Sequence, residues 1–137
     1  MHPIIRNILA VIAGFIVGSI VNGSLISISG TIIPPPEGTD TSTMEGLQAA
    51  IALFEPKHFL FPFLAHALGT LVGAFVAAKI SSNYGLQLAM LVGTIFFIGG
   101  LYMVFEVPAP LWFDILDLSL AYFPMAYLGW VLTKKKK

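Results

Sequence analysis

The feature that most constrains this chain is the placement of its charges around four long apolar segments. Acidic residues lie beside alternate boundaries of these segments, and the Lys and Arg residues lie beside the others, with Lys57 as the one exception. Because basic residues are retained on the cytoplasmic side during insertion, this alternation predicts a four-pass membrane protein with both termini cytoplasmic. The seven acidic residues are Glu37, Asp40, Glu45, Glu55, Glu106, Asp114 and Asp117.

The composition points to the same class of protein. With 57% hydrophobic and 10% charged residues, the chain of 137 residues is more apolar than a soluble domain of that size. We expect contact with a lipid bilayer, in the inner membrane of a bacterium. There is no cysteine, which excludes disulfides, thiolate metal sites and a cysteine nucleophile. A net charge of zero argues against a nucleic-acid partner.

The fold predicted from these segments is an all-α, four-transmembrane-helix bundle that forms a single integral membrane domain over residues 1–137. The expected spans are 8–28, 59–78, 85–105 and 111–133. At a rise of about 1.5 Å per residue each of them is long enough to cross a hydrocarbon core of roughly 30 Å. The first span has one alternative, a cleaved signal peptide, although it is longer than the usual apolar region of such a peptide.

A short amphipathic helix is expected over residues 43–54, in the outer loop between the first two spans. The Pro-rich stretch before it cannot be helical, and Ser42 with Glu45 three residues later forms a capping-box pattern. Apolar residues then recur at helical spacing until Pro56. This helix is too short to span a bilayer, so it lies in the outer interface or caps the bundle.

Small residues recur along the spans, several of them at four-residue intervals. In lipid such residues let helix backbones approach closely, and they therefore predict a compact bundle, with a homo-oligomer or another membrane protein as partner. A glycine-lined pore is the alternative. Gly99 and Gly100 also leave space at the depth of the polar residues described next. The glycines with predicted packing roles are Gly14, Gly18, Gly69, Gly73, Gly93, Gly99 and Gly100.

Three polar residues are predicted to share one layer of the bundle. Asn22, His66 and Asp117 each lie about 9 to 12 Å from the outer end of their span, counted from the helical rise. An ionisable group inside a span costs several kcal/mol unless it is paired or reaches water, so His66 and Asp117 are the main candidates for a functional site. Above this layer we expect an acidic vestibule formed by Asp114, Glu106, His58 and Glu55.

The chemistry of this layer leaves several functions open. His66 and Asp117 together can exchange one proton, and Asp114 with Asp117 can hold a hard cation if other oxygens complete its shell. We therefore expect a small transporter or channel-like protein that binds a cation or proton at these residues. The alternative is a non-transporting scaffold or accessory subunit, in which His66 and Asp117 only fix the register of two helices.

Enzyme activity has little support in the sequence. No phosphate-binding, dinucleotide-binding or nucleophile-elbow motif occurs, so no catalytic residue and no cofactor is predicted, and the identity of any metal stays open. A lipid-modifying enzyme that uses His66 and the two aspartates remains a third alternative, but nothing supplies an oxyanion or phosphate clamp.

Two segments carry a resemblance to known sequences. The stretch from Glu55 to Phe59 and on through Ala65 to Ala74, with residues 34–38 before it, resembles uncharacterised small four-pass membrane proteins of Bacteroidetes. The resemblance covers nearly the whole chain and implies a membrane location and four-pass topology. It implies no activity and no catalytic residue.

Overall fold

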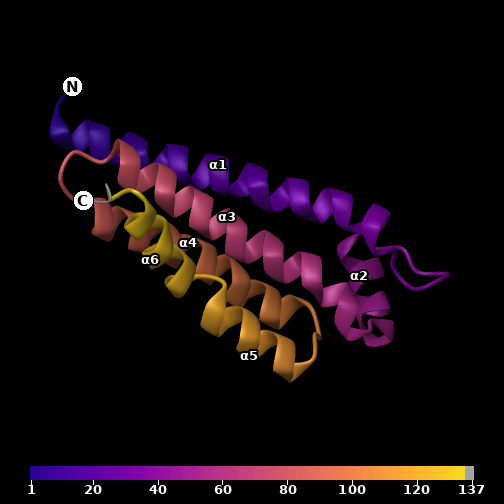
Figure 1. The fold of residues 1–137 in the computed structure, drawn as a ribbon. Coiled ribbons are helices and arrows are strands. Elements are labelled where there is room, and N and C mark those ends of the chain that lie inside the picture. The colour runs from indigo at the N-terminus through magenta and orange to yellow at the C-terminus, as the bar shows by residue number, and fades with distance from the viewer. Residues whose placement is uncertain (135–137) are drawn as a thin grey trace.

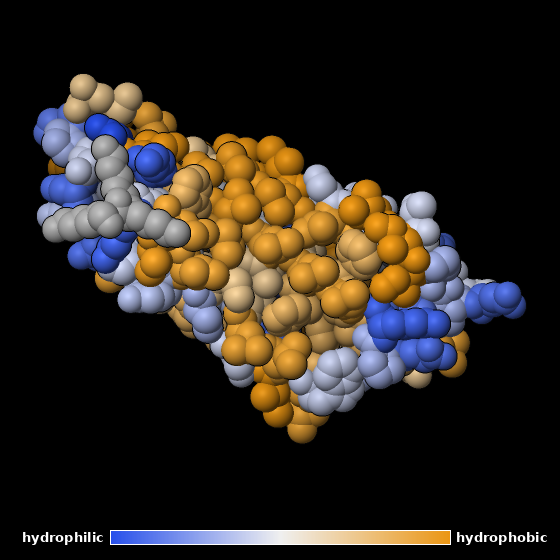
Figure 2. Space-filling view, viewed as in Figure 1, coloured by the Kyte–Doolittle hydropathy of each residue, from blue (hydrophilic) through white to orange (hydrophobic). Residues whose placement is uncertain are grey.

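The computed structural model describes residues 1–134, so three of the four lysines in the run 134–137 lie outside the described residues. Four helices in it are long and apolar enough to cross a membrane: Pro3–Ile32, Pro56–Ile80, Gly85–Glu106 and Leu111–Leu132. They run side by side as an elongated bundle (Figure 1). On the visible face a broad apolar region lies between two polar ends (Figure 2). The predicted all-α class and four-helix bundle, with a short helix between the first two spans, are confirmed.

The first helix, α1 (Pro3–Ile32), packs most extensively against α3 (Leu60–Ile80). Glycines make this close approach feasible. A Cβ atom added to Gly14 would lie 2.5 Å from the carbonyl oxygen of Gly73, and one added to Gly18 would lie 2.6 Å from that of Gly69. The two backbones therefore touch directly, which maximises dispersion contacts in a lipid solvent. α1 extends beyond the expected 8–28 at both ends.

The connection after α1 folds over one end of the bundle. α2 (Met44–Ala50) is followed by the 3-10 turns η1 (Ile51–Leu53) and η2 (Pro56–Phe59). The predicted cap at Ser42 is wrong. Thr43 is the N-cap and accepts the Gly46 N–H at 3.0 Å, whereas Ser42 bonds to Asp40.

The region of α2 and η1 covers one end of the bundle. Ile51 belongs to a buried cluster with Phe59 of η2, with Val107 of the link between the last two spans, and with Phe113 at the start of the last span. Gln48 adds a hydrogen bond of 2.6 Å to the carbonyl of Glu106. These contacts hold the cap over the ends of the spans on this side.

The opposite end of the bundle carries both described chain ends and the tight turn between α3 and α4 (Gly85–Glu106) (Figure 1). α1 is tied to this turn. Arg6 donates to the carbonyl of Ile80, and Asn7 accepts the N–H of Ser82 at 3.0 Å and contacts Asn83. These side-chain bonds fix the height of α1 relative to the α3–α4 hairpin.

The last span, predicted over 111–133, is interrupted and is not one continuous helix. It consists of α5 (Leu111–Leu120) and α6 (Phe123–Leu132), separated at Ala121 and Tyr122. Pro124 explains the break, because proline lacks an N–H and its ring clashes with the carbonyl four residues earlier, here that of Leu120. α6 packs against α3 and α4, with Ala126 in contact with Gly93.

Candidate functional site

The centre of the candidate site is a direct contact between His66 on α3 and Asp117 on α5. The Nδ1 atom of His66 lies 2.9 Å from both carboxylate oxygens of Asp117. Each residue follows its helix start by six positions, which places the pair about 9 Å inside the bundle. Asp117 is only 4% exposed. The two residues that the sequence singled out as ionisable groups at membrane depth therefore form a hydrogen-bonded pair.

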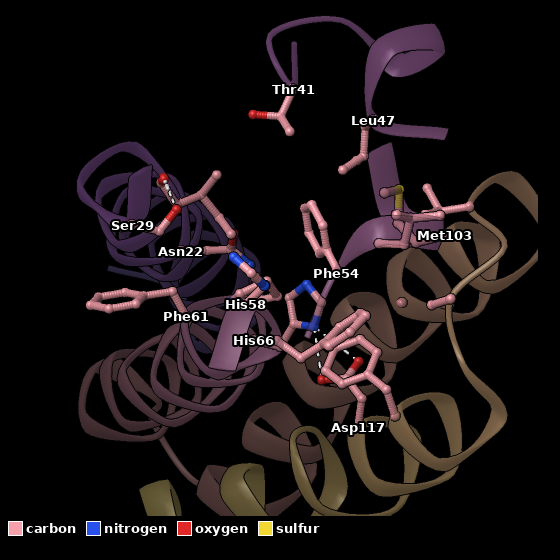
Figure 3. Close-up of a pocket in the computed structure, with 18 of the residues that line it drawn as sticks. Asn22, Ser29, Thr41, Leu47, Phe54, His58, Phe61, His66, Met103 and Asp117 are labelled. Atoms are coloured by element: carbon pink, nitrogen blue, oxygen red, sulfur yellow. Dashed lines mark hydrogen bonds and ion pairs between the residues drawn. The ribbon is translucent and has the colours of Figure 1, made fainter. Parts of the chain in front are cut away.

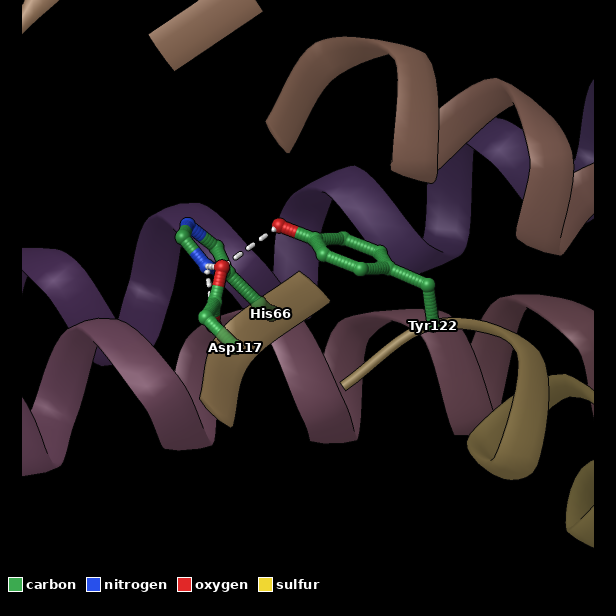
Figure 4. Close-up of polar contacts among 3 residues, drawn as sticks. All are labelled: His66, Asp117 and Tyr122. Carbon is green, nitrogen blue, oxygen red and sulfur yellow. Dashed lines mark hydrogen bonds and ion pairs between the residues drawn. The ribbon is translucent and has the colours of Figure 1, made fainter. Parts of the chain in front are cut away.

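Tyr122 is a third member of this cluster, and the sequence analysis assigned it no role. Its hydroxyl donates to Oδ2 of Asp117 at 3.0 Å, and its ring stacks at 5.8 Å from that of His66 (Figure 4). In a continuous helix, residues five positions apart point about 140° away from each other. The break before α6 turns Tyr122 back toward Asp117. Pro124 is the sequence signal from which this change of direction was predictable.

Gly100 on α4 makes room for the tyrosine. A Cβ atom at this position would collide with the Tyr122 hydroxyl, so the absence of a side chain allows the phenol to reach Asp117. The neighbouring Gly99 is different, because nothing lies within 4 Å of a Cβ built there. Gly99 lines open space and is not a helix-packing residue in this fold.

A pocket of about 630 Å³ lies above the cluster, between the helix ends and the cap formed by α2, η1 and η2 (Figure 3). Its lining reaches down to Asn22 on α1, His66 on α3 and Phe96 on α4, and extends no further toward the opposite end of the bundle. Most of the lining side chains are apolar. The pocket is therefore one-sided, with the polar cluster at its floor.

The two nitrogens of His66 have different surroundings. With Asp117 ionised, Nδ1 carries a proton and donates a hydrogen bond to the carboxylate, so Nε2 is the ring nitrogen left to contact water or a ligand. Nε2 faces the pocket (Figure 3), and the side chain is 21% exposed. A carboxylate that orients an imidazole in this way is the arrangement found where a histidine binds a ligand or transfers a proton.

The other predicted site residues are divided between the pocket and its surroundings. Asn22 and Asp114 line the pocket, but neither is within hydrogen-bonding distance of His66. Asp114 lies in the first turn of α5 and does not cap it, because the N-cap is Pro110. Glu106 is absent from the lining, and its backbone carbonyl is bonded to Gln48. Of the four residues predicted to form the vestibule, Asp114 and His58 line the pocket, and Glu106 and Glu55 do not.

His58 has a structural role that the sequence did not indicate. Its Nδ1 accepts the N–H of Glu55 at 2.9 Å, so its proton is on Nε2, which faces the carbonyl of Pro34 at 3.1 Å. His58 thereby joins the Pro-rich loop to η2 at the rim of the pocket. Glu55 is paired with Lys57 at 3.3 Å on the surface.

Below the cluster most of the fully buried residues are small. Ala74, Ala77, Ala89 and Ala126 are all 0% exposed. Thr70, one turn from His66 on α3, is also fully buried, and its hydroxyl has no hydrogen-bond partner among the described residues. Among the described residues, the hydrogen bonds between buried or partly buried side chains are those of the His66–Asp117–Tyr122 cluster.

Within residues 1–134 no group of three or more His, Cys, Asp or Glu side chains is arranged to hold a metal ion. No protein-family model matches the sequence, and no curated protein or solved structure shows significant similarity to it. The fold is that of a small four-pass membrane protein.

Proposed function

We propose that this protein is a small transporter or channel-like membrane protein that binds a proton or cation at His66 and Asp117. The supporting observation is the 2.9 Å contact between these residues at the floor of a pocket. A structural ion pair has no need of a cavity, whereas a pair that exchanges protons needs contact with water or ligand. The cost of placing ionisable groups at membrane depth favours a role in binding or transport.

The proposal includes the orientation of the protein in the membrane. The pocket opens at the end of the bundle that holds α2 and most of the acidic residues, and Arg6, Lys79 and Lys134 lie at the other end. By the positive-inside rule the pocket then faces away from the cytoplasm of a bacterial inner membrane. The resemblance to small membrane proteins of Bacteroidetes is compatible with this location and rests on the sequence segments alone.

Proton flux into reconstituted vesicles tests the proposal. Asp117→Asn keeps the shape of the side chain and removes its charge, so we expect it to abolish pH-driven flux while the protein stays folded. Glu37→Gln is the matched control, because Glu37 is exposed in the loop and lies outside the pocket, and it should conduct like the wild type. Unchanged flux in Asp117→Asn would refute the site assignment.

A scaffold or accessory subunit is the second candidate function. A shallow apolar groove of about 350 Å³ lies between α1 and α4 near the chain ends, lined by Ile8, Val11 and Leu91 among others. Such a groove suits packing against another transmembrane helix. If Val11→Trp changed the oligomeric state or released a co-purifying membrane protein, and Asp117→Asn had no effect on flux, this function would replace transport.

A further inference from the structure

We propose that the pocket above His66 and Asp117 binds a lipophilic organic cation, an apolar molecule with a positively charged centre. This inference rests on the proposed function and names the class of ligand for the same site. It follows from the size of the pocket, from its aromatic walls and from the balance of charges on its lining.

The size and the walls define the apolar part of the ligand. A volume of about 630 Å³ falls within the range of pockets that enclose drug-sized molecules and far exceeds the need of a proton or metal ion. Aromatic rings come from four different parts of the chain and surround this space. They belong to Phe54, Phe59, Phe61, Phe96, Phe113 and Tyr122. Aromatic faces attract cations, and most strongly where water is excluded.

The charges on the lining define the polar part. His66 and Asp117 neutralise each other when the imidazole is protonated. Lys57, at the rim, is paired with Glu55. Asp114 remains, and its carboxylate has no ion-pair or hydrogen-bond partner among residues 1–134. The negative charge of the Asp114 carboxylate is therefore not neutralised by a neighbouring group, and a cationic ligand supplies the positive charge that pairs with it.

The charges on the lining argue against lipophilic anions and neutral molecules of similar size as ligands. A fatty acid or another lipophilic anion would place a second negative charge beside Asp114, where the apolar surroundings screen repulsion poorly. A neutral molecule would leave Asp114 unpaired. Asn22 lies on the opposite side of the pocket from Asp117 (Figure 3). Its amide is neutral, so it does not change the net charge of the lining.

Two probe ions of the same shape and opposite charge test the inference. Tetraphenylphosphonium and tetraphenylborate are both apolar and bulky, so nonspecific partition into micelles affects both. We expect the purified full-length protein to bind the phosphonium saturably at one site per chain, and to show no saturable binding of the borate. Saturable borate binding, or no phosphonium binding, would overturn the inference.

Three variants locate the site. Asp114→Asn should weaken phosphonium binding at least tenfold, because it removes the unneutralised charge. Phe61→Leu keeps an apolar wall but removes an aromatic face, and should weaken binding about two- to fivefold. Glu45→Gln, on the exposed start of α2 and outside the lining, should bind like the wild type. Equal binding by wild type and Asp114→Asn would contradict the assignment of this charge.

The proton-binding site and the class of ligand can be refuted independently of each other. Proton flux is measured without any organic ion present, so Asp117-dependent flux without phosphonium binding would refute the ligand class and leave the proton site standing. Phosphonium binding that depends on Asp114, together with flux that ignores Asp117→Asn, would refute the proton site and support the ligand class.

Discussion

The two halves of this bundle use the same helices for different purposes. In the half with the chain ends, glycine and alanine bring the helices into backbone contact, as at Gly14 and Gly73. In the half with α2, the space between the helices holds aromatic side chains, a pocket of about 630 Å³ and the His66–Asp117 pair. Both halves must be stable in lipid, where apolar burial provides no driving force between helices.

The difference shows how stability and a binding site are separated along one helix. α3 contributes Gly69 and Gly73 to the close contact with α1, and one turn earlier it contributes His66 to the pocket floor. The change from polar to small residues occurs within one turn after His66, where Gly69 contacts α1 and Thr70 is fully buried. The close-packed half with the chain ends can thus hold His66 and Asp117 at a fixed distance from each other.

Removing the carboxylate from the polar half should have the largest effect on stability. Asp117→Ala leaves a buried imidazole and the Tyr122 hydroxyl without their shared acceptor, and such losses cost about 3–5 kcal/mol. Reversible unfolding in mixed micelles measures this. Asp117→Asn retains an acceptor and should cost less, so equal losses in the two variants would show that hydrogen bonding to this residue does not support the fold.

Adding a side chain within the close-packed half should cause the next largest loss of stability. A Cβ atom at Gly73 would lie 2.7 Å from the carbonyl oxygen of Gly14, so Gly73→Ala must push α1 and α3 apart, at about 1–3 kcal/mol. Gly23→Ala is the control, because nothing lies within 4 Å of a Cβ there. If both variants unfolded alike, the backbone contact would not be what holds the two helices together.

The boundary between the halves offers a stabilising substitution. Thr70→Val keeps the branched shape and removes a buried hydroxyl that has no partner among the described residues, so we expect a gain of about 1 kcal/mol. The same unfolding assay measures it. A loss of stability in Thr70→Val would show that the hydroxyl is bonded, and would move the boundary of the polar region deeper into the bundle.

The smallest effect on stability is expected from a substitution in the loop before α2, at Ser42. Hydrogen bonds from the hydroxyl and N–H of Ser42 lower the pKa of Asp40 below its ordinary value. The stabilisation from ionised Asp40 is therefore complete above the ordinary carboxyl pKa and is lost as the pH falls through the lowered one. An NMR titration of this carboxyl group checks the direction. In Ser42→Ala the pKa should rise part of the way back, since only the N–H bond remains.

The sequence was sufficient for the class of fold, because apolar length and small-residue spacing are properties of single segments. It also singled out His66 and Asp117, since ionisable groups are rare inside spans. It did not predict that Tyr122 would join them, because that contact depends on the direction the chain takes after the break at Pro124. Open space at Gly99 and Gly100 and a vestibule above the polar layer were predicted, but the volume and the apolar lining of the pocket were not, since they depend on how far the cap of α2 and η1 stands from the helix ends.

The most direct test of the central claim is solid-state NMR of the ¹⁵N-labelled His66 imidazole in lipid bilayers. The account predicts that Nδ1 carries a proton in a hydrogen bond to Asp117, while Nε2 is in contact with water in the pocket. An Nε2 atom that shows no contact with water, or an Nδ1 atom that shows no hydrogen bond to Asp117, would contradict it.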